Sequence, residues 1–285
     1  TTMMGISVFP DDDQLFCGMI GTHGVKMANA AVNECDVLFL VGARVGDRAV
    51  KTPLALEKTT KIIHIDIDPA EIGKNIGADL PLVGDAKLVL QQMTELAKPM
   101  KHDEWIAHIK TLGGERKYVE PAKGTVNPRV FIDRLAKKMP ANVTVVADVG
   151  QNQIWTCTEY KFRKEGRLLT SGGMGTMGYS VPAAIGAKMA DNSRATVAIC
   201  GDGAFQMSFM ELATAVQFGV DIKVVVMTNN RLGMVRELQT NGYHDRQTAV
   251  FLDGSPDFIK LAEAYGIPAM RVYDDDTMDL SLIHI

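Results

Sequence analysis

The chain has 285 residues, of which 46% are apolar and 22% charged, and its formal net charge is −4. This length predicts roughly two domains of about 150 residues each, with enough apolar residues for two packed cores. The negative charge and the lack of a Lys/Arg run argue against nucleic acid or an anionic membrane as a partner. No apolar run is long enough to span a bilayer.

The cysteines and the first residues bear on the compartment. The four cysteines lack the C-x-x-C spacing of a zinc site, and the chain opens without a basic and apolar leader. We therefore expect buried, reduced thiols in a cytoplasmic protein. These cysteines are Cys17, Cys35, Cys157 and Cys200.

Apolar β-branched runs alternate with helical patterns, an order typical of parallel sheets covered by helices. In chain order, the expected strands occupy 36–42, 61–67, 143–150, 195–203 and 222–229. Helical spacing occupies 24–34, 127–139, 182–190 and 209–219. We expect an α/β fold of two parallel-sheet domains with helices on both faces. They would cover 1–98 and 127–285, joined by a charged linker with one short helix over 99–126.

The stretch Gly201-Asp202-Gly203 follows an expected strand, at the edge where open parallel sheets bind ligands. A helix expected near 205–218 would direct its N-terminal N–H groups to the same place, which favours a phosphate. Asn229 ends the next strand, one strand–helix–strand crossover later. One carboxylate, one amide oxygen and a loop carbonyl suit a Mg²⁺ ion that also holds a diphosphate. The alternative is an ordinary turn, which a lone G-D-G forms far more often.

Several motifs together resemble one family. G-D-G followed by an N-N pair is similar to the thiamin-diphosphate motif, and DVGQNQIW, TSGGMGTMGYSVPAAIGA and NNRLGMVRELQ resemble the cofactor domain of acetohydroxyacid synthase, also called acetolactate synthase. In the first half, GMIGTHGVKMANAAVNECDVLFLVGARVGDR, KIIHIDIDPAEIGKN and LVGDAK resemble that family's central FAD-binding domain. The resemblance extends, in order, over nearly the whole chain.

The resemblance implies a role for particular residues of the second half. The side chains of Asp202 and Asn229 and the backbone carbonyl of Arg231 would bind Mg²⁺, which leaves the Arg231 side chain free. Met177 would support the bent cofactor, the Gly175 carbonyl would accept from its pyrimidine amino group, and Met234 would line the pocket. Without the flanking glycines, such methionines would be read as core residues. Residues expected around the diphosphate are Gly150, Gln151, Asn152, Gly203, Ala204, Leu232 and Gly233.

For the first half, the resemblance implies an extended FAD across strand ends, so the missing G-x-G-x-x-G does not count against it. Gly46 replaces a usual acid and could loosen the flavin, and Leu238 replaces a tryptophan that favours 2-ketobutyrate. Solvated loop arginines remain the alternative for Arg44 and Arg48, and His64 is interpreted as a core histidine with an ordinary partner. The expected FAD residues are Thr22, His23, Gly42, Arg44, Arg48, Asp66, Ile67, Asp85 and Ala86.

The activity implied by the resemblance is decarboxylation of pyruvate and condensation of the remaining two carbons with pyruvate or 2-ketobutyrate, for branched-chain amino-acid synthesis. It further implies a homodimer or homotetramer and a small regulatory subunit. The alternatives are glyoxylate carboligase, pyruvate oxidase, or a non-catalytic nucleotide-binding fragment. The family's first domain supplies a catalytic glutamate, and we expect a partial chain that lacks it and ends in non-native SLIHI.

Overall fold

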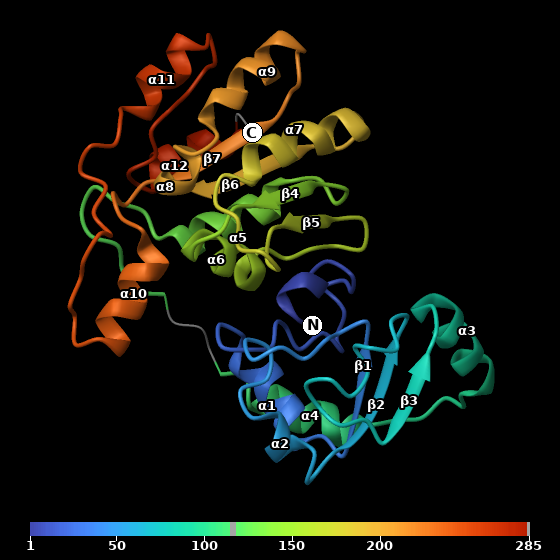
Figure 1. Cartoon of the computed structure of the whole chain (residues 1–285). Coiled ribbons are helices and arrows are strands. Elements are labelled where there is room, and N and C mark those ends of the chain that lie inside the picture. The colour runs from blue at the N-terminus through green and yellow to red at the C-terminus, as the bar shows by residue number, and fades with distance from the viewer. Residues whose placement is uncertain (115–117, 284–285) are drawn as a thin grey trace. The chain divides into compact units, whose positions relative to one another are not determined.

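The computed structural model describes residues 1–114 and 118–283 and divides the chain into two compact units (Figure 1). Unit 1 comprises Thr1–Met3 and Cys17–Arg116, and unit 2 comprises Met4–Phe16 and Lys117–Ile285. Each unit contains a parallel sheet with helices, so the predicted α/β architecture is confirmed. Residues 115–117 of the expected linker and the last two residues of SLIHI lie outside the described residues.

Unit 1 is built on a parallel sheet with the strand order β1-β2-β3. Leu40 lies opposite His64 in the register of β1 and β2, and it packs in a core cluster with Ile62 and Ile76. The elements are β1 (Val37–Val41), β2 (Lys61–Asp66), β3 (Leu80–Val83), α1 (Lys26–Glu34), α2 (Pro53–Leu56), α3 (Ala86–Leu96) and α4 (Asp103–Thr111); a short 3₁₀ turn, η1 (Met3–Gly5), precedes them.

Two expectations for unit 1 change in the structure. The short helix of the expected linker is α4, and it packs against α1, with His108 Nε2 2.6 Å from Glu34 Oε2. His64 is buried as expected, but neither ring nitrogen has a hydrogen-bond partner among the described residues, so the ordinary core partner is not found.

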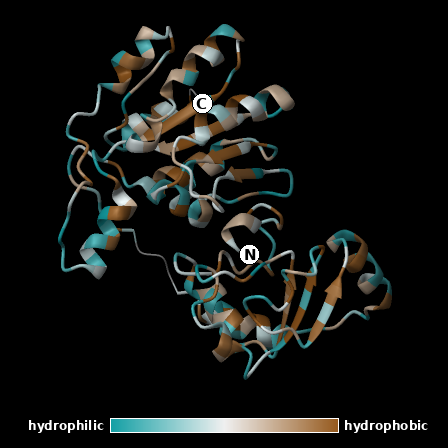
Figure 2. Cartoon of the chain, viewed as in Figure 1, coloured by the Kyte–Doolittle hydropathy of each residue, from teal (hydrophilic) through white to brown (hydrophobic). Residues whose placement is uncertain are grey.

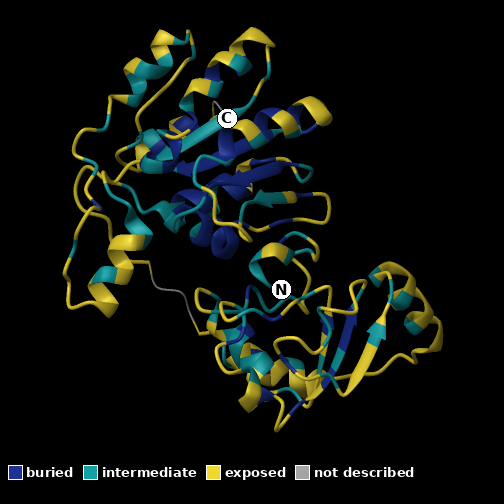
Figure 3. Ribbon diagram, viewed as in Figure 1, coloured by how far each residue is buried: buried dark blue, intermediate teal, exposed yellow. Residues whose placement is uncertain are grey.

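Unit 2 is built on a parallel sheet with the order β5-β4-β6-β7. Strands β4 and β6 lie in the middle and are the most buried, as Figure 3 shows, and their apolar residues give the sheet its hydrophobic colour in Figure 2. The elements are β4 (Thr144–Ala147), β5 (Arg167–Thr170), β6 (Thr196–Gly201), β7 (Lys223–Met227), α5 (Pro128–Lys138), α6 (Gln151–Glu159), α7 (Ser180–Ala190), α8 (Asp202–Phe205), η2 (Phe209–Glu211), α9 (Leu212–Gln217), α10 (Gly233–Gly242), α11 (Phe258–Ala264) and α12 (Asp275–Ile283).

The strand order of unit 2 creates a crevice between β4 and β6. From β4 the chain crosses through α6 to β5, and from β6 it crosses through α9 to β7 on the other side of the sheet. Right-handed crossovers in opposite directions place their helices on opposite faces. The loops after β4 and β6 therefore separate at the carboxyl edge, and such a switch point is where open α/β sheets bind ligands.

The structure also corrects some predicted elements. The single helix expected near 205–218 is divided into α8, η2 and α9, because Ser208 has a non-helical backbone (φ −145°, ψ 9°). A Cβ on Gly178 would lie 3.0 Å from Met207 Cβ, so the preceding loop packs against this break. Strands β3 and β5 were not predicted.

The cysteines only partly follow the expectation of buried thiols. Cys157 and Cys200 are buried, whereas Cys17 and Cys35 are partly exposed, and no disulfide joins any two of the four. Burial raises the pKa of the Cys157 thiol to about 12 and raises that of Cys200 as well. Both buried thiols therefore stay protonated, and poorly nucleophilic, at neutral pH.

Candidate functional site

A cavity of about 110 Å³ lies at the carboxyl ends of β4, β6 and β7 in unit 2. It brings together parts of the four segments that the sequence analysis assigned to one cofactor: the loop after β4, the loop before α7, the G-D-G turn and the N-N segment. The lining residues are Val149, Gly150, Gln151, Asn152, Trp155, Met177, Gly201, Asp202, Gly203, Ala204, Met227, Asn229, Arg231, Leu232, Gly233, Met234 and Val235.

Asp202 joins the tips of β6 and β7. Its side chain is 1% exposed, and Oδ1 accepts a hydrogen bond from the N–H of Gly203 at 2.9 Å. Oδ2 accepts from the backbone N–H groups of Asn229, at 3.0 Å, and of Asn230. An ionised carboxylate offers about four acceptor positions. Three are used by the backbone, which leaves one on Oδ1 for a cation in the cavity.

Asn229 and Arg231 continue this turn. Asn229 Oδ1 accepts from the N–H of Arg231 at 3.0 Å, and it keeps a second lone pair. The sequence analysis expected a free Arg231 side chain, but the structure shows that it is engaged. Its Cζ lies 4.4 Å from the ring centroid of Phe251, in a cation–π contact. These two residues also form an isolated antiparallel bridge, so the Arg231 backbone is fixed from the far side of the loop.

The starts of α6 and α10 face the cavity without side-chain caps. Gly150 precedes α6 with φ +141°, a conformation that suits glycine, and neither Gly150 nor Leu232, the residue before α10, makes a side-chain capping hydrogen bond to its helix. Uncapped N–H groups at a helix start favour an anion. A Cβ on Gly233 would overlap Oε1 of Gln151. The starts of α6 and α10 therefore approach each other closely at Gly233, where there is no room for a side chain.

Two polar side chains of α6 hold the cavity wall. Gln151 Nε2 donates to Glu237 Oε2 at 2.8 Å and so links α6 to α10. Asn152 is buried, and its Nδ2 donates to the carbonyls of Asp148 at 2.8 Å and Ile199 at 3.1 Å. Both amide hydrogens of Asn152 therefore bridge β4 and β6, and only its backbone N–H remains for a diphosphate.

The apolar wall contains most of the expected groups and some that were missed. Met177 and Met234 line the cavity, and Met177 Cε would lie 3.6 Å from a Cβ on Gly203. Gly175 is exposed and is not among the lining residues. Trp155 and Met227 were not predicted. Trp155 follows Gln151 by one helical turn, a spacing that could have placed it on the same face.

The residues present fit a Mg²⁺–diphosphate group with an organic part beside it. Asp202, Asn229 and the Arg231 carbonyl offer three oxygen ligands, and the two helix starts offer N–H donors. Among residues 1–114 and 118–283 no cluster of three or more His, Cys, Asp or Glu forms a metal site. The expected arrangement needs only one carboxylate, so that finding does not bear on it.

The residues expected at the flavin lie mainly at the carboxyl edge of the unit 1 sheet. Gly42 follows β1, Asp66 ends β2 and Asp85 follows β3, and the three strands are parallel. Ile67 and Ala86 come directly after Asp66 and Asp85.

The other expected flavin residues lie in two loops of unit 1. The N–H of Thr22 donates to the carbonyl of Arg48 at 2.9 Å, which joins the loop of Thr22 and His23 to that of Arg44 and Arg48. The two arginines are exposed, as in the solvated alternative. Asp85 Oδ1 accepts from Leu88 N at 3.1 Å and thereby caps α3.

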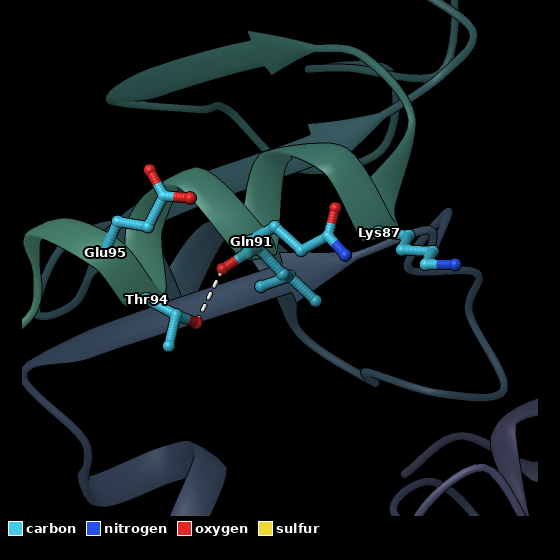
Figure 4. Close-up of a pocket in the computed structure, with 5 residues that line it drawn as sticks. Lys87, Gln91, Thr94 and Glu95 are labelled. Carbon is cyan, nitrogen blue, oxygen red and sulfur yellow. Dashed lines mark hydrogen bonds between the residues drawn. The ribbon is translucent and has the colours of Figure 1, made fainter.

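A second pocket lies on the surface of α3, as Figure 4 shows. Lys87, Gln91, Thr94 and Glu95 line it with Leu90, whose carbonyl accepts from Thr94 Oγ1 at 2.7 Å. All five residues belong to one helix, and none is an expected site residue. The described part of the chain contains no helix long and apolar enough to cross a membrane.

Comparison with known families matches both units. Residues 1–93 match the thiamine pyrophosphate enzyme central domain, and residues 148–282 match the thiamine pyrophosphate enzyme C-terminal TPP binding domain. Thiamine pyrophosphate is thiamin diphosphate, so the second match covers every residue that lines the unit 2 cavity.

Similar curated proteins extend these matches over almost the whole chain. A probable acetolactate synthase large subunit of Methanocaldococcus jannaschii is 42% identical over 97% of this chain and 48% of its own length. The acetolactate synthase large subunit of Lactococcus lactis is 37% identical over 99% of this chain and 50% of its own. The acetolactate synthase isozyme 3 large subunit of Escherichia coli is 37% identical over 95% of this chain and 49% of its own length.

The chain spans about half the length of these curated relatives. The two domain matches together cover most of the chain, in the same order as the two observed units. The chain therefore belongs to the thiamine pyrophosphate enzymes, as a homologue of acetolactate synthase large subunits.

Proposed function

We propose that the unit 2 cavity binds thiamin diphosphate through Mg²⁺ and that this chain forms the cofactor-binding part of an acetolactate synthase. The reaction would decarboxylate pyruvate and condense the product with pyruvate or 2-ketobutyrate, as a step toward valine, leucine and isoleucine. The observation that carries the proposal is that Asp202 accepts from the N–H of Asn229, which brings the two ends of the G-D-G and N-N motif to one point beside two uncapped helix starts.

Each part of the cavity has a separate task in this proposal. Asp202, Asn229 and the Arg231 carbonyl would hold Mg²⁺, while the backbone N–H groups of Gln151 and Gly233 would bind diphosphate oxygens. Met177 and Met234 would exclude water from the reacting carbon, and the Gly175 carbonyl would accept from the pyrimidine amino group. When bound, thiamin diphosphate supplies a carbon nucleophile for the keto group of pyruvate.

The proposal extends to unit 1 and to assembly. The edge formed by Gly42, Asp66 and Asp85 would bind FAD, in keeping with the match to the central domain. The names of the similar proteins identify them as large subunits, which supports a small regulatory subunit as a partner of the protein to which this chain belongs. A homodimer or homotetramer is proposed on the family resemblance alone.

Calorimetric titration with thiamin diphosphate, with and without Mg²⁺, tests the central part of this proposal. We expect Mg²⁺-dependent binding that Asp202→Ala abolishes and Asn229→Ala weakens at least tenfold, because each loses a metal ligand. Asn229→Ala is the cleaner variant, since among the described residues its side chain accepts one hydrogen bond, from Arg231 N. Asp221→Ala removes an exposed carboxylate just before β7 and should bind as the unaltered chain does.

Unchanged affinity and unchanged Mg²⁺ dependence in both Asp202→Ala and Asn229→Ala would contradict the assignment. Binding of thiamin diphosphate without any requirement for a divalent ion would contradict it too. Circular dichroism of each variant establishes that it is folded before its titration is interpreted.

A further inference from the structure

Asp148 is a buried carboxylate next to the cavity that none of the roles above uses. It follows β4 directly, is 0% exposed, and does not line the cavity. Its Oδ1 accepts from the N–H of Val149 at 2.8 Å and of Gly178 at 3.0 Å, and its Oδ2 accepts from the N–H of Ser180 at 2.8 Å.

These hydrogen bonds join two loops that meet at the cavity. Val149 begins the loop that leads into α6, while Gly178 belongs to the segment between β5 and α7 and Ser180 follows that segment. The N–H of Gly178 is part of the peptide group that follows Met177, so Asp148 fixes the main chain of the residue that contributes the apolar wall. Ser180 is the first residue of α7, where a negative charge is favoured by the helix dipole.

Asp202 has the same arrangement one strand away. Each of the two aspartates follows a central strand, accepts from the N–H of its own successor, and accepts twice more from a neighbouring loop. They differ in what they face: Asp202 lines the cavity and Asp148 does not. The position of Asp148 therefore suits fixing a loop, whereas that of Asp202 suits a cation.

We propose that Asp148 is a positioning residue that holds Met177 against the organic part of thiamin diphosphate. This inference rests on the proposed function of the cavity and goes beyond it, because it separates the control of cofactor conformation from the binding of Mg²⁺–diphosphate. Asp148 acts on the conformation of the cofactor through Met177. The binding of Mg²⁺–diphosphate is performed by Asp202, Asn229 and the two helix starts.

The substitution Asp148→Asn separates these two tasks. The asparagine has a single amide oxygen, which can take the place of Oδ1 and accept from the same two N–H donors. Its NH₂ group then faces the N–H of Ser180 and cannot accept a hydrogen bond from it. The N–H of Ser180, at the start of α7 and three residues after Met177, loses its charge-assisted hydrogen bond, while the N–H groups of Val149 and Gly178 keep an acceptor that is neutral instead of charged. The loss should thus fall on the Met177 side.

The experiment compares two probes, thiamin diphosphate and inorganic diphosphate, each titrated with Mg²⁺ present. Asp148→Asn should weaken thiamin diphosphate binding on the order of tenfold and leave inorganic diphosphate binding unchanged. Met177→Ala should show the same selectivity, and the double variant should be no weaker than the weaker single variant, because both changes remove one interaction. Asp202→Ala should lose both ligands.

Ile132→Ala is the matched control, since Ile132 is fully buried in α5 and lies outside both the loop after β4 and the loop before α7. It should lower the melting temperature and leave the ratio of the two affinities unchanged. Equal losses for both probes in Asp148→Asn, or additive losses in the double variant, would overturn the proposal. Failure of the unaltered chain to bind thiamin diphosphate would instead refute the proposed function.

If Asp148→Asn does not fold, amide hydrogen exchange in the unaltered chain decides the matter. The N–H groups of Gly178 and Ser180 should exchange slowly although Gly173 to Gly175 in the same loop are exposed. Thiamin diphosphate should slow both further, because the cofactor would press on Met177. Rapid exchange at both positions, or no change with the cofactor, would overturn the role of Asp148.

Discussion

Burial raises the pKa of the Asp11 carboxyl to about 6, against an ordinary value of 3.8. The residue lies beside Phe162 in unit 2, and the N–H of Phe162 donates to Asp11 Oδ2 at 3.1 Å, while Oδ1 is buried and has no hydrogen-bond partner in the described part of the chain. The folded state thus holds this proton more tightly than the unfolded state does. Between pH 4 and 6 the unfolded chain releases it first, so the contribution of Asp11 to stability falls as the pH rises.

Asp11→Asn should therefore stabilise unit 2 above pH 6, because the neutral side chain avoids the cost of burying a charge. We expect the melting temperature at pH 7.5 to rise by roughly 2–4 °C, which corresponds to about 1 kcal/mol after discounting for the partial exposure of the group. Below pH 4 the difference should vanish. Thermal unfolding followed by circular dichroism across this pH range measures it.

Asp12→Asn provides the control for that measurement, since Asp12 is exposed and adjacent in sequence. It should leave the melting temperature nearly unchanged at every pH. A gain for Asp11→Asn that is as large at pH 4 as at pH 7.5 would show that burial of the charge is not its cause.

At the residue scale, the sequence predicted contacts that depend on regular geometry. Asp202 and Asn229 meet because parallel strands joined by one crossover end at the same edge. The stacking of Arg231 on Phe251 and the bridge that Asn152 makes between β4 and β6 were not predicted. Both depend on tertiary packing between segments whose local patterns carry no sign of the contact.

At the scale of elements, the missed strands share a physical explanation. β3 and β5 each have four residues and lie at an edge of their sheet, so little of either is buried. β3 also contains Pro81, which lowers strand propensity and is tolerated at an edge. Strands β2, β4 and β6 were predicted because buried central strands read as continuous apolar runs.

The strand tips of unit 1 lead to a prediction about FAD. Arg44 lies in the exposed loop after β1, on the side of the sheet edge where the flavin is proposed. Arg44→Ala should remove nearly all FAD from the desalted protein, because a charged contact to the cofactor is lost. The absorbance spectrum of the purified chain after incubation with FAD measures the bound fraction.

Lys51→Ala is the comparison, since it removes an exposed cation from the segment after Arg48. It should retain FAD as the unaltered chain does. If Gly46 loosens the site as expected, the unaltered chain should itself lose part of its flavin on dilution. A chain that holds no FAD under any of these conditions would contradict the proposed flavin site.

At the scale of the whole molecule, we expect the 285 residues by themselves to supply only part of the proposed catalytic apparatus. Asp202 is the one carboxylate among the described residues that line the cavity, and its oxygens are directed to the backbone and the proposed metal site. The family resemblance assigns the glutamate that protonates the cofactor pyrimidine to a domain outside this chain. Without that acid, proton removal from the cofactor should be slow.

We therefore expect the isolated 285-residue chain to bind thiamin diphosphate but to form no measurable acetolactate from pyruvate, Mg²⁺, FAD and thiamin diphosphate. The full-length large subunit of Lactococcus lactis, assayed in parallel, is the positive control. Acetolactate formation by the isolated chain at a comparable rate would mean that the catalytic acid lies within these residues.

The central claim is that one cation joins the G-D-G and N-N motifs to a diphosphate at the switch point of unit 2. Its most direct test is a crystal structure of the chain with thiamin diphosphate and Mn²⁺ in place of Mg²⁺, in which anomalous scattering locates the metal. We predict one strong peak within about 2.3 Å of Asp202 Oδ1, Asn229 Oδ1 and the Arg231 carbonyl oxygen, with the diphosphate at the starts of α6 and α10. A metal bound elsewhere, or a cofactor ordered outside this cavity, would contradict the account.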